Sequence, residues 1–220
     1  MAPRNATGSR SDTMDHVPDQ TINRLPIYLR CLTQARAVGI AVVNSLQLAQ
    51  MAGTNAAQVR KDLSYLGELG RRGIGYDVEG LIAHVSDVLG LTEKRRVAIV
   101  GYGRLGGALH SYRGLADRGF DIVAVFDDDA GKVGAPAGDL TVASIDDLED
   151  VLRSLDVEIV ILATPTASGQ DIAERVASAG VRAIMNFTNA RLELPDDVRV
   201  RPVDLSVELQ VLSFYLARTS

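Results

Sequence analysis

The chain has 220 residues and a formal net charge of −5 at pH 7, which suits one or two globular domains. Its hydrophobic fraction of 46% is ordinary for such proteins, and no apolar run reaches the length of a membrane span. The single cysteine, Cys31, excludes a disulfide framework within one chain and predicts a packed, buried thiol. Residues 1–18 are polar and lack the apolar core of a secretory signal, so they predict a disordered tail and a cytoplasmic protein.

Charge is distributed unevenly along the chain. Residues 19–80 contain 7 basic and 5 acidic side chains, whereas residues 81–220 contain 14 basic and 21 acidic ones. A mildly basic first part favours contact with nucleic acid more than the whole-chain charge indicates.

Three helices are predicted in residues 21–69. Thr21 is expected to cap the first helix, which tolerates Pro26 near its start. Ser45 and Thr54 are expected to cap the second and third, and the small residues between these two helices are typical of a helix-turn-helix. The third helix has polar side chains outside its apolar face that can contact base edges or phosphates, namely Asn55, Gln58, Arg60, Lys61 and Ser64.

A glycine-flanked segment with two arginines, Arg71 and Arg72, follows this pattern. It predicts a β-wing whose arginines contact DNA. Residues 77–91 are predicted to form a linking helix, so the DNA-binding domain with its linker spans 19–92. His84 lies in that helix and is interpreted as a packed residue, and no metal site is predicted.

An apolar strand from Val97 leads into a glycine-rich loop and a helix predicted over 105–118. The loop has the G-x-G-x-x-G spacing, with glycines that permit a tight turn, a close approach of pyrophosphate and close helix packing. The helix start adds free N–H groups for phosphate. The residues expected to hold the nucleotide here are Gly101, Tyr102, Gly103, Arg104, Leu105 and Gly106.

A second strand, 121–126, ends in three acidic residues. Asp127 or its neighbour Asp128 is expected to accept hydrogen bonds from the ribose hydroxyls, and which of Asp127–Asp129 does so stays open. The next basic residue is only Lys132, so NAD(H) is favoured over NADP(H).

Buried parallel strands are predicted at 157–163 and 181–187, with a last strand at 198–203. Ligands bind at the carboxyl ends of such strands, which here carry Thr164 and Pro165, within a predicted loop over 164–168, and Asn186 and Phe187. The Rossmann-like domain therefore spans 93–203. Residues 204–220 form an apolar helix that docks on its own domain or is exchanged with a second subunit.

From Thr164 to the end, the chain has no histidine, lysine or cysteine to serve as a hydride-transfer acid. This favours a protein that senses its cofactor and is not an enzyme. The alternatives are an NAD-dependent oxidoreductase with a helical N-terminal domain and a CoA-binding Rossmann protein.

The order of motifs resembles the bacterial redox-sensing transcriptional repressor family Rex. The segments that carry the resemblance are 24–30, the recognition-helix motif 57–65 including Tyr65, the wing 71–76, the glycine loop, Phe126-Asp127-x-Asp129, and 203–215. Family members often carry alanine where this chain has Tyr102.

The resemblance implies an α/β protein with a winged helix-turn-helix, a Rossmann-like parallel sheet and a domain-swapped C-terminal helix. It implies a homodimer that NADH releases from a palindromic operator, while NAD⁺ competes and permits binding. By motif, the family's switch residues fall on Arg24, Tyr112 and Asp204, with Arg30 near the first of them. Asp204 and Leu205 of a second copy are expected at the nicotinamide, whose neutral form buries more readily than its charged form.

Overall fold

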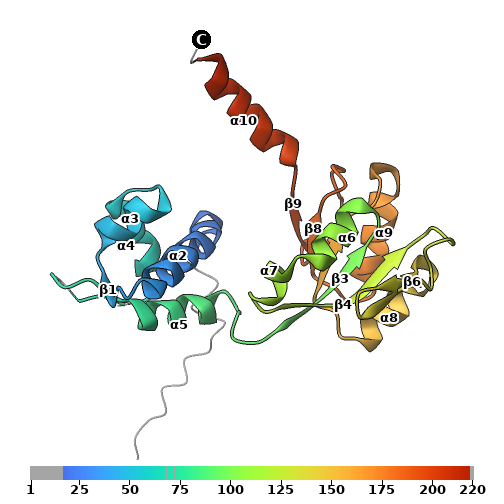
Figure 1. Cartoon of the computed structure of the whole chain (residues 1–220), viewed down its shortest axis with the longest axis horizontal. Coiled ribbons are helices and arrows are strands. Elements are labelled where there is room, and N and C mark those ends of the chain that lie inside the picture. The colour runs from blue at the N-terminus through green and yellow to red at the C-terminus, as the bar shows by residue number, and fades with distance from the viewer. Residues whose placement is uncertain (1–16, 68, 72, 219–220) are drawn as a thin grey trace, which may run out of the picture. The chain divides into compact units, whose positions relative to one another are not determined.

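A computed structural model describes residues 17–67, 69–71 and 73–218 of the chain (Figure 1). Its contacts divide the chain into two compact units, Met1–Glu93 and Lys94–Ser220. The predicted tail lies outside the described residues, except for its last two positions. Among the described helices, none is long and apolar enough to cross a membrane.

The first unit is a winged helix-turn-helix. Its elements are α2 (Asp19–Ala37), β1 (Val42–Val43), α3 (Ser45–Ala52), α4 (Ala56–Ser64), β2 (Tyr76–Asp77) and α5 (Val78–Val88). β1 and β2 pair antiparallel and form the base of the wing. The core gathers one apolar face from each helix, including Leu32 of α2, Leu48 of α3, Leu63 of α4 and Val85 of α5.

The helix starts differ from the sequence expectation. Asn44, and not Ser45, caps α3: its side chain accepts from the N–H groups of Leu46 and Gln47, and the Gln47 side chain accepts from the Asn44 N–H. This reciprocal capping box satisfies two groups at once, which a lone serine does not. Asn55 likewise caps α4 in place of Thr54.

The first helix starts earlier than expected. α2 begins at Asp19, so Thr21 is not a cap but a buried side chain within the helix. Pro26 consequently lies well inside α2, on its exposed side, where water can serve the carbonyl that loses its N–H partner. Cys31 is buried as predicted, and burial raises the pKa of its thiol.

The second unit is built on a seven-stranded sheet with the order β5-β6-β4-β3-β7-β8-β9. The strands are β3 (Arg95–Val100), β4 (Phe120–Asp127), β5 (Pro136–Ala137), β6 (Leu140–Ser144), β7 (Ile159–Leu162), β8 (Ala183–Asn186) and β9 (Arg199–Pro202). All neighbours pair parallel except β5, which runs antiparallel to β6.

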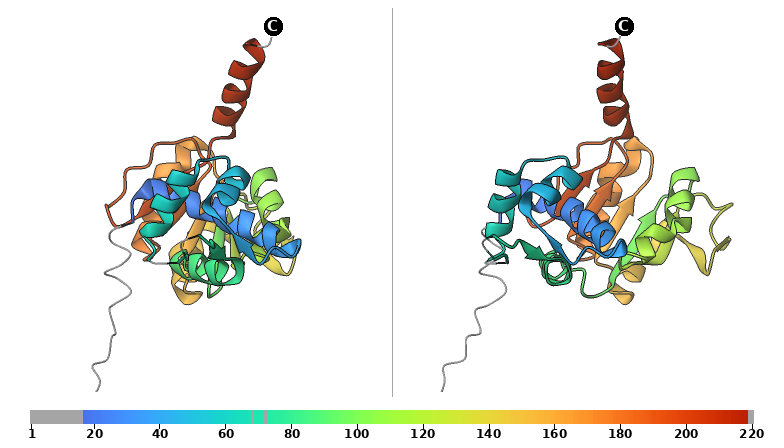
Figure 2. Two further views of the ribbon diagram at one scale, coloured as in Figure 1. Left: turned by 90° about the vertical axis from the view of Figure 1, so that its left-hand side faces the viewer. Right: turned by 60° about the vertical axis from the view of Figure 1, so that its left-hand side comes forward.

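Helices cover both faces of this sheet (Figure 2). They are α6 (Arg104–Ser111), α7 (Arg113–Ala116), α8 (Leu148–Ser154), preceded by the 3-10 turn Ile145–Asp147, and α9 (Thr166–Ser178). α8 and α9 pack on one face through residues such as Leu152 and Val176. Leu109 of α6 and Leu115 of α7 pack on the other. This doubly wound arrangement confirms the predicted Rossmann-like sheet.

Two local predictions for this unit are wrong, and two short strands were missed. The helix predicted over 105–118 breaks at Tyr112, whose backbone is extended (φ −79°, ψ 96°) and whose ring occupies the space that a side chain at Gly114 would need. The strands β5 and β6 were not predicted, because Leu140–Ser144 is short and only partly buried. α9 begins at Thr166, so the predicted loop over 164–168 is already helical in its second half.

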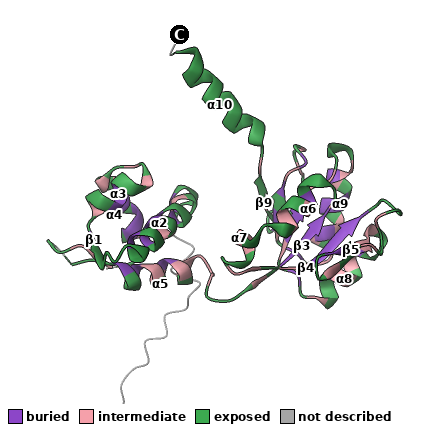
Figure 3. Cartoon of the chain, in the orientation of Figure 1, coloured by how far each residue is buried: buried purple, intermediate pink, exposed green. Residues whose placement is uncertain are grey.

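The last helix, α10 (Leu205–Ala217), has no buried residue (Figure 3). It leaves the sheet directly after β9 (Figures 1 and 2). Its large apolar side chains are between 46% and 71% exposed, with Leu209 at 66% and Leu216 at 71%. An apolar helix left bare along its whole length is unusual for a lone chain and marks an interaction surface.

Candidate nucleotide-binding site and nucleic-acid interface

The glycine loop between β3 and α6 has the geometry that a pyrophosphate needs. Gly101 has φ +97°, and a Cβ there would lie 2.5 Å from the carbonyl oxygen of Ala163. A Cβ on Gly106 would overlap the Gly101 oxygen, whereas one on Gly103 would meet nothing within 4 Å. Gly101 and Gly106 thus make the turn and the close helix packing, and Gly103 faces open space at the start of α6.

A buried carboxylate supports this loop from β4. Asp127 is 5% exposed, and its Oδ2 accepts from the Tyr102 N–H at 2.8 Å and from Lys132 Nζ at 2.9 Å. Its Oδ1 accepts from the Asp129 N–H at 2.9 Å. Burial raises the pKa of Asp127, but these donors outweigh it and hold the pKa below the usual value. Asp128 is exposed. Asp127 is therefore the ionised group beside the loop.

Residues at the ends of β7 and β8 divide into two kinds. Thr164 lies against Gly101, and its buried Oγ1 has no hydrogen-bond partner among the described residues. Asn186 is 2% exposed and hydrogen-bonded through both side-chain polar atoms: its Oδ1 accepts from the N–H and hydroxyl of Thr188, and its Nδ2 donates one bond to the Ala190 carbonyl. Asn186 therefore shapes the loop after β8, while the buried Thr164 hydroxyl is left without a hydrogen-bond partner among the described residues.

These observations fit a dinucleotide. The loop offers an open approach at Gly103 and the uncapped first turn of α6, which begins with the exposed residues Arg104 and Leu105. The Asp127 carboxylate lies at the end of β4 beside this loop, and the Thr164 hydroxyl, without a partner among the described residues, lies on the opposite side of Gly101 from that strand. Phe187 is half-buried against the same face of the sheet as the loop.

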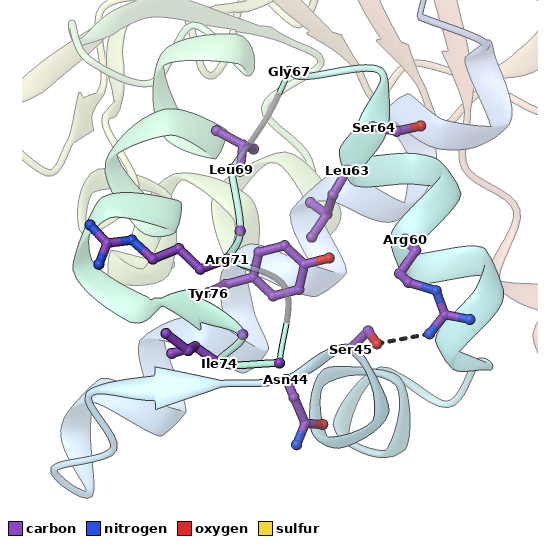
Figure 4. Close-up of a pocket in the computed structure, with 13 residues that line it drawn as sticks. Asn44, Ser45, Arg60, Leu63, Ser64, Gly67, Leu69, Arg71, Ile74 and Tyr76 are labelled. Carbon is purple, nitrogen blue, oxygen red and sulfur yellow. Dashed lines mark hydrogen bonds between the residues drawn. The ribbon is translucent and has the colours of Figure 1, made fainter.

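The first unit places a hollow between α4 and the wing, with a volume of about 660 Å³ (Figure 4). Arg60 of α4 donates to the Ser45 hydroxyl at 3.0 Å, and the Tyr76 hydroxyl points toward these two groups. Burial raises the pKa of Tyr76, so its hydroxyl keeps its proton and can donate. The Arg71 side chain extends away from Tyr76.

The predicted DNA-contacting residues differ in how free they are. Lys61 and Ser64 are exposed on α4, and Tyr65 is half-exposed just after it. Asn55 and Gln58 are engaged within the unit: Asn55 caps α4, and Gln58 donates to Asp62 at 2.9 Å. Arg72 lies outside the described residues.

A buried charge network joins α2 to α4. Asp62 is fully buried, and its Oδ1 accepts from Thr21, Arg24 and Gln58. Its Oδ2 accepts from Arg24 at 2.6 Å and from Tyr28 at 2.7 Å. Burial raises the pKa of Asp62, but the donors together bring it down to about 2. The sequence offered no local sign of this network, because its partners lie on two helices far apart in the chain.

The other predicted switch residues lie in the second unit. Asp204 caps α10, with its Oδ1 accepting from the N–H and hydroxyl of Ser206, and these bonds hold its pKa below the usual value. Tyr112 stands at the break between α6 and α7 and is 56% exposed. Leu205 is 63% exposed. Both Tyr112 and the start of α10 are therefore accessible in a single chain.

Comparison with known proteins supports both units. Residues 16–64 match a family described as "Putative DNA-binding protein N-terminus", and residues 92–190 match one described as "CoA binding domain". Fold and site together define a DNA-binding regulator with a nucleotide-binding Rossmann domain. The "Redox-sensing transcriptional repressor Rex" of Carboxydothermus hydrogenoformans is 48% identical over 202 residues, which is 92% of this chain and 97% of the relative. The chain belongs to the Rex family of redox-sensing transcriptional repressors.

A second sequence relative and two solved structures also match the chain over most of its length. Rex of Streptomyces coelicolor is 45% identical over 217 residues, covering 99% of this chain and 82% of that protein. The crystal structure of RSP, a Rex-family repressor, in complex with β-NAD⁺ and operator DNA superposes with a TM-score of 0.87 at 33% identity, covering 92% and 94% of the two chains. RSP in complex with β-NADH gives a TM-score of 0.85 at 31% identity, with 93% and 96% covered.

Proposed function

We propose that this protein is a DNA-binding transcriptional repressor that senses the ratio of NADH to NAD⁺, and that NADH releases it from operator DNA. One observation carries the proposal. A winged helix and a dinucleotide cradle, which is the glycine loop Gly101–Gly106 with Asp127, occur on one chain that matches Rex proteins over nearly its whole length. RSP, a member of the family, was crystallised with NADH, and with NAD⁺ and operator DNA. The glycine loop and Asp127 would hold and orient the dinucleotide, and the bound nicotinamide would supply the redox signal.

In this proposal α4 reads the major groove and the wing enters the neighbouring minor groove. One sugar-phosphate strand separates these two grooves, so it passes over the hollow between α4 and the wing. Arg60, Ser45 and Tyr76 lie there with hydrogen-bond donors, which suits a phosphodiester. Lys61, Ser64 and Tyr65 then face the DNA from α4 and its end.

We infer that the active species is a homodimer in which α10 is buried against a second copy. Its support is the bare apolar surface of α10, since exposing so many large side chains in a lone chain is unfavourable. A two-fold dimer matches a palindromic operator, with half-sites about one helical turn, ~34 Å, apart. The exchanged helix would bring Asp204 and Leu205 of one copy to the cradle of the other.

The switch must respond differently to NADH and NAD⁺, because a ligand shifts an equilibrium only by its difference in affinity for two states. Asp204 is an ionised side chain suited to sense the charge of the nicotinamide ring, and Tyr112 is accessible beside the cradle helix. Arg24 is held by Asp62, so a switch role would require that ion pair to open. Arg30 is exposed on the same helix and is the better candidate.

The curated relatives are repressors, so we propose that the nucleotide is bound and released unchanged, without turnover of a substrate. A repressor of this kind acts where the bacterial DNA lies, in the cytoplasm.

Binding of nucleotides to the full chain tests the proposal. Calorimetric titrations with NADH, NAD⁺, NADPH and CoA should show binding of the first two, with NADH the tighter. Tight binding of CoA without NADH would favour the CoA alternative, and conversion of added substrate with NADH would favour an oxidoreductase. Arg30→Ala is expected to blunt the NADH response of DNA binding.

A further inference from the structure

Tyr102 and His110 form a contact between the glycine loop and α6 that no step of the proposed function uses. Tyr102 Oη lies 3.0 Å from His110 Nδ1, and the hydroxyl donates in the tautomer that carries the ring proton on Nε2. The two rings meet edge to face, with centroids 5.8 Å apart and planes at 61°. Both side chains are half-buried, so this contact is a fixed part of the second unit.

His110 is itself held from its other side. A Cβ on Gly138, in the turn between β5 and β6, would lie 3.1 Å from His110 Cε1, so the imidazole packs directly against that turn. The ring is thus placed between the turn and the Tyr102 hydroxyl. A partner that cannot swing away restricts the tyrosine more strongly than a free surface histidine does.

Tyr102 also bonds through its backbone. Its N–H donates to Asp127 Oδ2 at 2.8 Å, and its ring packs against the apolar cluster under the loop that includes Ile99 and Val125. Tyr102 therefore ties the loop to the Asp127 carboxylate through its main chain and to α6 through its side chain. Gly101 and Gly103, on either side of it, have no side chains that could do this.

We propose that the Tyr102–His110 contact preorganises the glycine loop and so raises the affinity for NADH and NAD⁺ by the same factor. The inference rests on the proposed function. The loop would bind the pyrophosphate, which both forms share, whereas the two forms differ only at the nicotinamide. A loop that is already ordered costs less conformational entropy to close on its ligand, whichever redox form is bound.

This contact then sets the total nucleotide concentration to which the protein responds, and not the redox ratio. A uniform change in affinity leaves the competition between NADH and NAD⁺ unaltered, because only differences between the two ligands shift the balance. The difference is left to the residues near the nicotinamide. Absolute sensitivity and redox discrimination are thereby assigned to separate residues.

Tyr102→Phe tests the proposal, since it removes the hydroxyl and keeps the ring. Dissociation constants of the full chain for NADH, NAD⁺ and ADP-ribose are measured by calorimetry, ADP-ribose being the part without nicotinamide. Loss of one hydrogen bond should weaken all three by about two- to tenfold, with the NADH to NAD⁺ ratio unchanged. Ser111→Ala is the matched control, because the Ser111 hydroxyl bonds only to Gly107 and Ala108 within α6. It should change none of the three.

A double-mutant cycle separates the contact from general damage. His110→Ala should weaken the three ligands by a similar factor, and adding Tyr102→Phe should cost little more, because both changes remove one interaction. Unaltered affinity in Tyr102→Phe, or a change for only one redox form, would overturn the proposal while leaving the repressor function intact. If the wild-type chain binds neither nucleotide, the proposed function falls, and this inference falls with it.

Discussion

Arg24 and Asp62 form a two-bond ion pair that fastens α2, the first described helix of the winged domain, to α4. Arg24 Nε lies 2.6 Å from Oδ2 and Nη2 lies 2.7 Å from Oδ1, and the Asp62 side chain is wholly buried. Such pairs specify geometry more than they add stability, and removing one partner is costly because the other is left uncompensated.

We expect Asp62→Asn to lower the free energy of unfolding at pH 7 by about 3 kcal/mol. Arg24 then faces an uncharged amide, and the buried hydroxyls of Thr21 and Tyr28 lose the anion to which they donate. Tyr28→Phe, which removes one donor to Oδ2, should cost only about 1 kcal/mol. Urea denaturation measures both. Equal stability of Asp62→Asn and wild type would show that the network contributes nothing net.

The same carboxylate predicts an acid dependence. Asp62 has a pKa of about 2 against an ordinary 3.8, so it stabilises the fold above pH 4 and this contribution is lost as the pH falls toward 2. The difference corresponds to about 2 kcal/mol. Urea midpoints of wild type and Asp62→Asn should therefore converge between pH 4 and pH 2. A gap that stays constant over this range would contradict the depressed pKa.

The hollow beside the wing predicts a phosphate contact. Arg60→Gln should weaken operator and random DNA by the same factor and reduce the slope of log affinity against log salt by about 1, because one fewer counterion is released. Tyr76→Phe should weaken both DNAs equally with an unchanged slope, since it removes no charge. Loss of operator binding alone in Arg60→Gln would instead assign Arg60 to a base.

Asp127 should dominate nucleotide affinity over its neighbour. Asp127→Asn is expected to weaken NADH and NAD⁺ by about tenfold or more, because hydrogen bonds to a charged acceptor are worth about 1.5–3 kcal/mol. Asp128→Asn, which changes an exposed carboxylate, is the matched control and should bind as wild type does. The reverse result would place the ribose on Asp128. Thermal unfolding without nucleotide checks that both variants are folded.

The bare helix α10 predicts the oligomeric state. Leu209→Asp should convert a dimer into a monomer, because it places a charge in the middle of an apolar interface. Glu208→Gln, on the adjacent position, should remain dimeric. Sedimentation equilibrium distinguishes the two masses. A wild-type chain that sediments as a monomer would contradict the proposed homodimer.

Features that depend on local backbone chemistry could be predicted from the sequence. Gly101 and Asp127 were assigned correctly to the loop and the end of β4, because a left-handed turn requires glycine and parallel strands bring their carboxyl ends together. The predicted caps of α3 and α4 were each wrong by one residue, and Thr21 lies inside α2, three residues after the N-cap Pro18. Asn44 outcompetes the serine beside it because Gln47 completes a reciprocal capping box.

Features that depend on contacts between distant parts of the chain could not be predicted from the sequence. From the sequence alone, the charged side chain of Asp62 is expected to be exposed to solvent on α4. Its partners Arg24 and Tyr28 lie 38 and 34 residues away in the chain, and only the fold brings them into contact with it. Asn186 is predicted to line the ligand cleft, and the sequence did not indicate that its side chain also bonds to the loop after β8. The break at Tyr112 depends on packing of its ring over Gly114, which has no signature in periodicity.

The central claim is that NADH, and not NAD⁺, releases the protein from DNA. The most direct test is fluorescence anisotropy of a labelled palindromic operator at fixed salt, titrated with NADH and, separately, with NAD⁺. Salt is held constant because phosphate contacts make affinity strongly salt-dependent. We expect release by NADH at far lower concentration than by NAD⁺, and a weakened NADH response in Asp204→Ala. DNA binding that ignores NADH at saturating concentration would contradict the central claim.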